Sequence, residues 1–386
     1  MIRARRATLA LTSFTALALG LSACGNDGGT TSGETGANGG TTDGGSATNG
    51  ATDSGDSTAD DSTGTDTGAA AQGDSDGTLT LYSGRNEDLV QPVLDQFTDE
   101  TGIEVQVRYA DTASMAAQLL EEGDNSPAEV FLAQDAGALG AVANGGLLQA
   151  LPQETLDLVP ELYRSDDGDW VGLTGRSRVL AYNKDNVSAD ELPAHVSELT
   201  GPEWSGRVGV APTNASFQAF VTAMRVLEGD DVAQQWLDDL AANDPQIREK
   251  NGVIVADVDS GAIDVGLVNH YYIYELAQER GVEPEDLNVA LHFFEDGDTG
   301  ALVNISGIAL VGEQPDGDAQ ALIDYLLSEQ GQTYFVEQTA EYPMIEGVNP
   351  PAGLPALDEL DAPEIDLNDL DDLQHTIEMI TQAGLL

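Results

Sequence analysis

Residues 79–97, LTLYSGRNEDLVQPVLDQF, contain a predicted strand followed at once by an amphipathic helix. Leu79 to Tyr82 predicts the strand. After a short polar turn, apolar side chains recur from Leu89 to Phe97 at the three- and four-residue spacing of one helix face. Pro92 falls in the first turns of that helix, where proline is best tolerated. The stretch therefore predicts one β–α unit.

The same alternation of strand and helix continues through the rest of the chain. Strands are expected at 105–109, 130–132, 208–210 and 263–268, and helices at 115–120, 139–143 and 232–240. Strands that alternate with helices imply α/β sheets, mostly parallel, with helices on both faces. The part from Thr78 to Leu386 is too long for one simple core and is expected to form two lobes.

The first residues are typical of a secretory signal. Arg3, Arg5 and Arg6 precede an apolar run from Ala7 to Leu21, and the chain's single cysteine, Cys24, follows small residues. The position resembles the lipobox of bacterial lipoproteins, so residues 1–23 are predicted to be a signal peptide and Cys24 to be lipidated. An unpaired thiol is the alternative.

Residues 24–77 are almost entirely small and polar, and no large aliphatic or aromatic side chain occurs between Asn26 and Gly77. Such a segment cannot offset the entropy of ordering, and we expect a disordered tether. The sequence thus predicts an extracytoplasmic protein anchored to the cell membrane only through its lipid.

The chain is strongly acidic, with 68 acidic residues, 14 basic residues and a formal net charge of −54. This charge repels nucleic acid and anionic lipid headgroups, which excludes both as direct partners. A solvated acidic coat that keeps the protein soluble explains the charge better than a role in binding.

Motifs of the common enzyme classes are missing. The sequence has no G-x-x-x-x-G-K-[ST] phosphate loop and no H-E-x-x-H zinc motif, and its one G-x-S-x-G match, Gly73–Gly77, lies in the small, polar segment and not at a strand-to-helix elbow. The four histidines, His195, His270, His292 and His375, lack metal-ligand spacing. His270 is expected to be exposed to solvent, with a supporting role behind the tyrosines as the alternative. We therefore expect no catalytic activity.

Four strand-to-helix junctions carry polar residues. Parallel sheets bind ligands beyond the carboxyl ends of their strands, where these junctions gather. They are residues 83–87, 133–135, 212–216 and 269–272. The last contains the adjacent phenols Tyr271 and Tyr272, which as phenolates suit ferric iron, a hard cation that prefers anionic oxygen. The alternative is that both tyrosines only pack at a lobe interface.

Several segments together resemble one family. They are Leu81–Arg85, Thr101–Ile103, Ser126–Phe131, Trp170–Val179, Asn269–Tyr272 and Glu341–Pro343. In these segments the chain resembles the bacterial periplasmic ferric-ion-binding proteins of ABC importers. The resemblance implies a two-lobed periplasmic-binding-protein fold, with the chain crossing between lobes near 172–182 and 301–310. It assigns 78–176 plus 303–350 to the first lobe and 177–302 plus 351–386 to the second.

The resemblance also implies a site. Tyr271 and Tyr272 match the family's paired tyrosine ligands. Residues matching those that hold a synergistic anion, phosphate or carbonate, are Thr213, Asn214, Ala215, Ser216, Asn251 and Asn269. Arg176 and Arg178 match arginines beside the cleft, although pairing with nearby carboxylates is an equal alternative.

The first lobe departs from the family. Asn86 and Gln134 stand where many members have histidine and glutamate ligands. Glu87 and Asp135 are carboxylates that suit ferric iron, but acids at these positions also cap helices, and both interpretations stay open.

The family implies capture of ferric iron by hinge closure and delivery by a monomer to the permease subunits of an ABC importer. The alternative is the same receptor fold binding another solute without iron, such as a small oxyanion, a polyamine or a thiamine-like compound.

Overall fold

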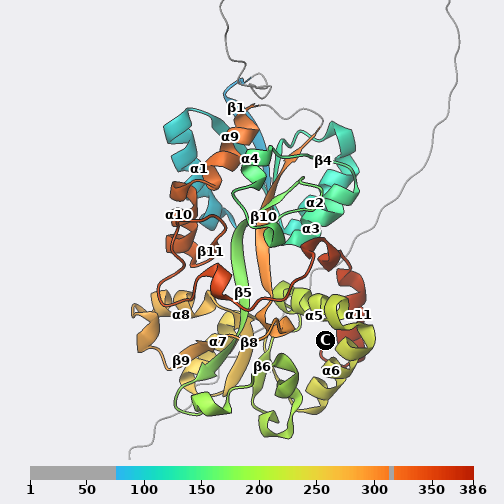
Figure 1. Cartoon of the computed structure of the whole chain (residues 1–386), viewed down its shortest axis with the longest axis vertical. Coiled ribbons are helices and arrows are strands. Elements are labelled where there is room, and N and C mark those ends of the chain that lie inside the picture. The colour runs from blue at the N-terminus through green and yellow to red at the C-terminus, as the bar shows by residue number, and fades with distance from the viewer. Residues whose placement is uncertain (1–74, 313–316) are drawn as a thin grey trace, which may run out of the picture. The chain divides into compact units, whose positions relative to one another are not determined.

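A computed structural model describes residues 75–312 and 317–386 (Figure 1). The predicted signal peptide, Cys24 and all but the last residues of the tether lie outside the described residues. Within the described ranges, no helix has both the length and the apolar character needed to cross a membrane.

The strands form one continuous hydrogen-bonded path in the order β2-β1-β3-β10-β5-β8-β6-β7. At one end β1 (Thr78–Ser83) runs parallel to β2 (Glu104–Tyr109) and to β3 (Val130–Ala133). At the other end β6 (Val208–Val210) runs parallel to both neighbours, β8 (Val265–Asn269) and β7 (Gln246–Ile247). The strand–helix alternation in the sequence correctly predicted these parallel units.

Two long strands join the two ends of this path. β5 (Val171–Asn183) and β10 (Val303–Val311) run antiparallel and side by side (Figure 1). β5 pairs with β10 through Ser177 and with β8 from Arg178 onward, so it belongs to both halves of the sheet. The sheet is therefore mixed, and the two crossings between lobes implied by the resemblance are these strands. The short strands β4 (Leu148–Gln149), β9 (Val289–His292) and β11 (Tyr342–Pro343) pair at the sides of β10 and β5.

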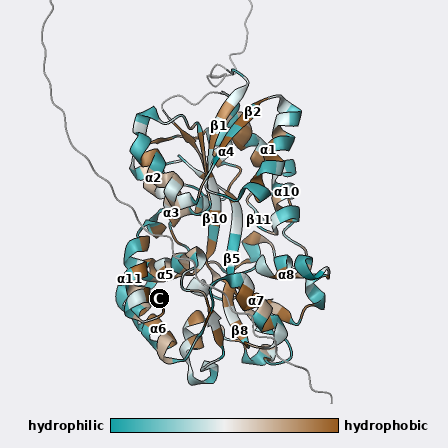
Figure 2. Ribbon diagram, turned by 180° about the vertical axis from the view of Figure 1, so that it is seen from behind, coloured by the Kyte–Doolittle hydropathy of each residue, from teal (hydrophilic) through white to brown (hydrophobic). Residues whose placement is uncertain are grey.

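Helices follow the strands at the predicted places. Their bounds are α1 (Glu87–Thr101), α2 (Thr112–Glu122), α3 (Ala136–Asn144), α4 (Gln153–Leu156), α5 (Ala215–Glu228), α6 (Asp230–Ala242), α7 (Asn251–Ser260), α8 (Tyr272–Arg280), α9 (Gly317–Leu326), α10 (Glu329–Thr339) and α11 (Leu373–Gln382). Hydrophilic residues dominate the exposed helices, for example α8 and α10 (Figure 2). Pro92 is the sixth residue of α1 and lies in its second turn, one turn later than the position where proline is best tolerated, so the helix lacks the hydrogen bond that an N–H there would donate to Asp88 O.

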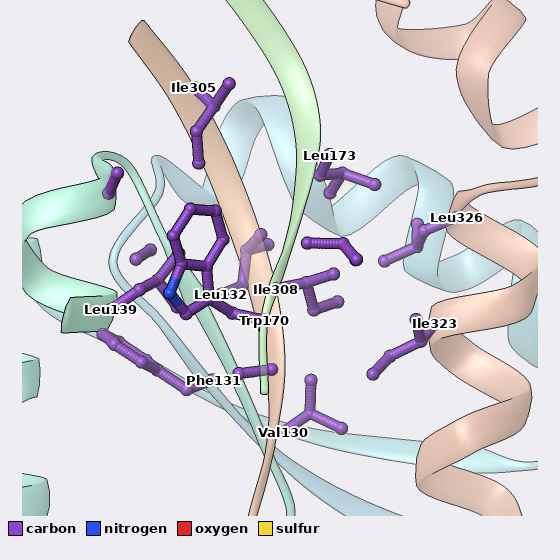
Figure 3. Close-up of a cluster of buried hydrophobic side chains, with 14 of the residues drawn as sticks. Val130, Phe131, Leu132, Leu139, Trp170, Leu173, Ile305, Ile308, Ile323 and Leu326 are labelled. Carbon is purple, nitrogen blue, oxygen red and sulfur yellow. The ribbon is translucent and has the colours of Figure 1, made fainter. Parts of the chain in front are cut away.

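The hydrophobic core is divided between the two lobes. In the first lobe, Phe131, Trp170 and Ile308 pack with α9 residues such as Ile323 around β3, β5 and β10 (Figure 3). Two further clusters lie in the second lobe, one around Phe220 of α5 and one around Ile254 of α7. Separate cores of this kind are what allow lobes to move about a hinge.

The C-terminal segment contacts both cores. Leu367 and Leu370 belong to the first cluster, whereas Met379 and Ile380 of α11 belong to the second. The segment 351–386, predicted to belong to the second lobe, therefore contributes to both cores, and the lobe boundaries stay a prediction.

Candidate functional site

The tyrosine pair lies where β8 ends and α8 begins. Tyr271 precedes the first residue of the helix, Tyr272, and the two rings stack with centroids 4.4 Å apart and planes tilted by 32°. Both side chains are half-buried. Burial raises the pKa of Tyr271 well above its ordinary value, and Tyr272 adds to this, while Arg176 opposes it. In the absence of a bound cation the Tyr271 phenol is therefore neutral.

His270 is completely buried, so the prediction that it faces solvent was wrong. Its Nδ1 accepts a hydrogen bond from Ser177 N at 3.1 Å, which leaves Nε2 to donate to Ala340 O at 2.7 Å. The ring meets Tyr271 edge-on with centroids 5.8 Å apart. Burial lowers the pKa of His270 to about 4. The neutral imidazole thus connects β5 to the segment after α10, directly behind the tyrosine pair.

Arg178 of β5 is a buried cation that has no carboxylate partner in the described part of the chain. Its side chain is 2% exposed, Nη1 donates to Ser216 Oγ at 3.0 Å and to Asn269 Oδ1 at 3.1 Å, and the guanidinium lies 5.7 Å from the centroid of the Phe220 ring. Burial lowers the pKa of Arg178 to about 10, although Tyr272 and Tyr271 act to raise it. Among the described residues no carboxylate lies within 4.0 Å of it, and its Nε and Nη2 have no hydrogen-bond partner. Pairing with a carboxylate, the alternative for this arginine, is therefore absent from the described part.

Arg176, two residues earlier, has such a partner. Its Nε lies 3.7 Å from Glu341 Oε1, and its Nη2 donates to Ile305 O at 2.8 Å and contacts Gln134 O. Glu341 also accepts from Arg85 Nη2 at 2.9 Å. Burial by itself raises the pKa of Glu341, but Arg85 and Arg176 outweigh it and the pKa is lowered. The sequence analysis did not place Glu341 and Arg85 beside the site, and because the two residues lie far apart in the chain, no local pattern indicated their pairing.

The predicted anion-binding residues gather around Ser216, at the start of α5. Asn214 caps this helix through its Oδ1, which accepts from Ser216 N at 2.9 Å and from Ser216 Oγ at 2.6 Å. Asn251 Nδ2 donates to Ser216 Oγ at 2.9 Å, and its buried Oδ1 has no partner. We call Arg178, Asn214, Ser216, Asn251 and Asn269 the Ser216 network.

Two further predicted residues, Thr213 and Ala215, are exposed beside the Ser216 network at the beginning of α5. The first backbone N–H groups of a helix carry partial positive charge and bind anions. Together with the free guanidinium nitrogens of Arg178, this end of α5 can hold an anion.

The predicted site residues of the first lobe are exposed or cap helices, and they do not gather as the second-lobe residues do. Asn86 is exposed and caps α1 through Asp88 N at 3.2 Å, and Asp135 is half-buried and caps α3 through Ala138 N at 3.0 Å. Glu87 and Gln134 are exposed. Capping, the alternative for Asp135, is thus observed for one of its oxygens. In residues 75–312 and 317–386, no three histidine, cysteine or carboxylate side chains gather to hold a metal ion. The backbone carbonyl of Gln134 contacts Arg176, which in turn acts on the ionisation of Tyr271.

Comparison of the sequence and the structure with known proteins identifies relatives among bacterial solute-binding proteins. Residues 125–372 match the model of a family described as bacterial extracellular solute-binding protein. The major ferric iron-binding protein of Neisseria meningitidis serogroup B is 34% identical over 313 residues, which cover 80% of this chain and 93% of that protein.

Two solved structures are similar as well. Iron-bound HitA from Pseudomonas aeruginosa has a TM-score of 0.71 and 37% identity, with 80% of this chain and 99% of that one covered. The IdiA (FutA) protein of Trichodesmium, in complex with iron and citrate, has a TM-score of 0.70 and 27% identity over 80% of this chain and 99% of its own. These two-lobed proteins share the fold described above. The chain therefore belongs to the family of bacterial extracellular solute-binding proteins that includes these ferric iron-binding proteins.

Proposed function

We propose that this protein captures ferric iron outside the cytoplasm and delivers it to an ABC importer. The observation that carries the proposal is the stacked pair Tyr271 and Tyr272 beside Arg178, a buried cation with no carboxylate partner in the described part. Phenolate oxygen is a hard anionic ligand that suits ferric iron. The relatives reported above bind iron, and binding of the same metal ion is the simplest function for this site.

A synergistic anion completes the second-lobe side of the proposed site. Phosphate or carbonate would accept hydrogen bonds from the N–H of Ala215, the first residue of α5, and from the free nitrogens of Arg178, since Asn214 already accepts from the next N–H groups of the helix. The Ser216 network positions these donors. Thr213 and Ala215 contribute backbone groups, and Asn251 and Asn269 contribute side chains to the surroundings of the anion.

Hinge closure would bring the first lobe to the metal. β5 and β10 are the crossings about which the lobes turn, and Glu87 and the uncommitted oxygen of Asp135 are the carboxylates that the first lobe offers. Asn86 and Gln134 contribute neutral oxygens. The closed form is the one that the permease subunits would recognise, and lipidation of Cys24 would hold the monomer at the membrane surface.

The test is a visible absorption titration of the purified full chain with ferric iron, in phosphate and in carbonate. We expect a phenolate-to-iron charge-transfer band that saturates at one metal per chain and weakens strongly in Tyr271→Phe and in Tyr272→Phe. Tyr274→Phe is the matched control, because Tyr274 lies on the same helix but its hydroxyl donates to Ala352 O at 2.6 Å. Absence of the band in the unaltered chain would refute the proposal and leave the receptor to another solute.

A further inference from the structure

A hollow of about 880 Å³ opens on the second lobe, and none of the proposed iron- or anion-binding residues lines it. It lies beside α5 and α6, which pack against each other (Figure 1). Buried Met224 and Trp236 line it together with Leu227 and Val232, whose side chains are 39% and 47% exposed. Exposed aliphatic side chains that adjoin buried ones in a concave surface are typical of a site that a partner covers.

The charged residues that line this hollow are acidic, apart from His195. They are Glu228, Asp231, Asp239, Asp296, Asp298 and Glu364. Glu228, Asp239 and Asp298 accept hydrogen bonds within the protein, and His195 lies 3.4 Å from Asp298. Asp231, Asp296 and Glu364 are exposed, and their carboxylates have no hydrogen-bond or ion-pair partner in residues 75–312 and 317–386. These three charges are therefore available to basic groups of a partner.

The net charge of the chain does not by itself distinguish this surface, because the whole chain carries 68 acidic residues. The apolar lining does. A second hollow, of about 870 Å³ between α1 and α10, is mostly polar, and its aliphatic residues are Leu89 and Pro92. A third, of about 430 Å³, contains the cation Arg164. The hollow beside α5 and α6 combines apolar side chains with unpaired negative charge, which fits a segment that is both apolar and basic.

One wall of the hollow belongs to the C-terminal segment. Residues 362–364 line it, and buried Pro363 lies beside Gly297. The next residue, Ile365, is part of the first-lobe core, whereas Met224 and Trp236 belong to a core of the second lobe. A partner in the hollow therefore contacts the second lobe and, at the same time, the segment that leads into the first-lobe core.

We propose that this hollow is the docking surface for a basic segment of a partner protein that carries an apolar anchor. The anchor, an aliphatic or aromatic side chain, packs against Leu227 and Val232. Lysine or arginine side chains beside the anchor pair with Asp231, Asp296 and Glu364. The apolar anchor supplies most of the binding free energy, and the exposed charge pairs select the partner and accelerate its association. This surface is separate from the proposed ferric site.

The experiment titrates a fluorescein-labelled synthetic peptide, Lys-Arg-Leu-Leu-Arg-Lys, with the full chain at physiological ionic strength and follows fluorescence anisotropy. We expect saturable binding of one peptide per chain. A peptide with serine in place of both leucines keeps the charge but loses the apolar contact, so it should bind roughly tenfold more weakly or worse. A peptide with glutamate in place of its basic residues should not bind, because it is repelled.

Two variants of the protein test the two halves of the proposed contact. Val232→Ser removes an exposed apolar side chain, and Glu364→Lys reverses an unpaired charge; each should weaken binding of the leucine peptide by roughly fivefold or more. Val282→Ser and Glu279→Lys are the matched controls, because both residues are exposed and line none of the three hollows. The controls should bind the peptide like the unaltered chain.

A peptide with photo-leucine in place of its first leucine locates the contact by cross-linking and mass spectrometry. Cross-links to α5, α6 or residues 362–364 would support the proposal. Cross-links scattered over the acidic surface, equal binding of the serine peptide, or equal binding by Val232→Ser and Val282→Ser would overturn it. Absence of saturable binding would overturn it as well. A dimer in analytical ultracentrifugation that Val232→Ser abolishes would assign the hollow to a second copy of the chain instead. No iron is present in these measurements, so their outcome leaves the ferric site untouched.

Discussion

Replacing His270 by glutamine tests whether the buried imidazole makes the protein sensitive to acid. The folded protein holds His270 neutral between Ser177 N and Ala340 O, and burial lowers its pKa from 6.5 to about 4. The unfolded chain takes up a proton near the ordinary value, so it binds more protons than the folded chain between these two pKa values. Stability therefore falls as the pH decreases from about 6.5 to about 4.

The magnitude follows from the pKa difference. Each pKa unit corresponds to about 1.4 kcal/mol, so the whole fall to about 4 amounts to roughly 3 kcal/mol of unfolding free energy. Between about pH 7.5 and about pH 5 the share of His270 is roughly 2 kcal/mol. Glutamine preserves the donor to Ala340 O and does not titrate, so His270→Gln should lose about 2 kcal/mol less than the unaltered chain over this interval.

Urea unfolding followed by tryptophan fluorescence at the two pH values measures this difference. The many carboxylates change the stability of both chains alike, so only the difference between them reports on His270. His292→Gln is the control, because His292 is half-buried and its Nε2 also lies 2.7 Å from a carbonyl, Pro193 O. An equal loss of stability in the unaltered chain and in His270→Gln would refute the reasoning.

Two other substitutions test the neighbourhood of the site. Glu341→Gln leaves Arg85 and Arg176 without their buried carboxylate and should lower the unfolding free energy by about 3–5 kcal/mol in urea titrations; a change below about 1 kcal/mol would show that these arginines are solvated. Asp135→Asn keeps a good helix cap, whereas Asp135→Ala removes it and should cost about 1 kcal/mol. If Asp135 also binds iron, both variants should weaken the charge-transfer titration equally; if it only caps α3, Asp135→Asn should titrate like the unaltered chain.

The sequence predicts the local units of this fold well because their signals are local. The apolar spacing from Leu89 to Phe97 predicted α1, and the strand before it is β1. Helix α6 was predicted from the same kind of pattern, although Val232, included in its apolar stripe, is 47% exposed. Packing against other elements decides which edge of a stripe is covered, and that information is not local.

The crossing strands show what the sequence leaves open. β5 is buried along almost its whole length, so its residues do not alternate between apolar and polar and their pattern does not indicate which strands they meet. The antiparallel pairing with β10 joins residues far apart in the chain. The resemblance to a known family implied these crossings, and the periodicity of the sequence did not.

The candidate site was predictable to a similar degree. The polar junctions identified Tyr271, Asn214 and Ser216 by position, because junctions after parallel strands gather at one edge. The burial of His270 depends on Ala340, seventy residues later, and the ion pair of Glu341 with Arg85 joins residues still further apart. Contacts of this kind set the charge and the rigidity of the site, and a single sequence does not contain them in readable form.

The distribution of charge explains how a neutral tyrosine pair can still bind a metal ion. Burial keeps the Tyr271 phenol neutral, so a cation must displace its proton, and a positive environment lowers the free energy of that step by stabilising the phenolate. A carboxylate against Arg178 would cancel this effect. The chain carries 68 acidic residues, yet within the described part none lies within 4.0 Å of Arg178, and the buried Glu341 is held by two other arginines. The acidic surface and the positive site are therefore separate features: the first sets the net charge, and the second stabilises the phenolates that the proposed ferric site needs.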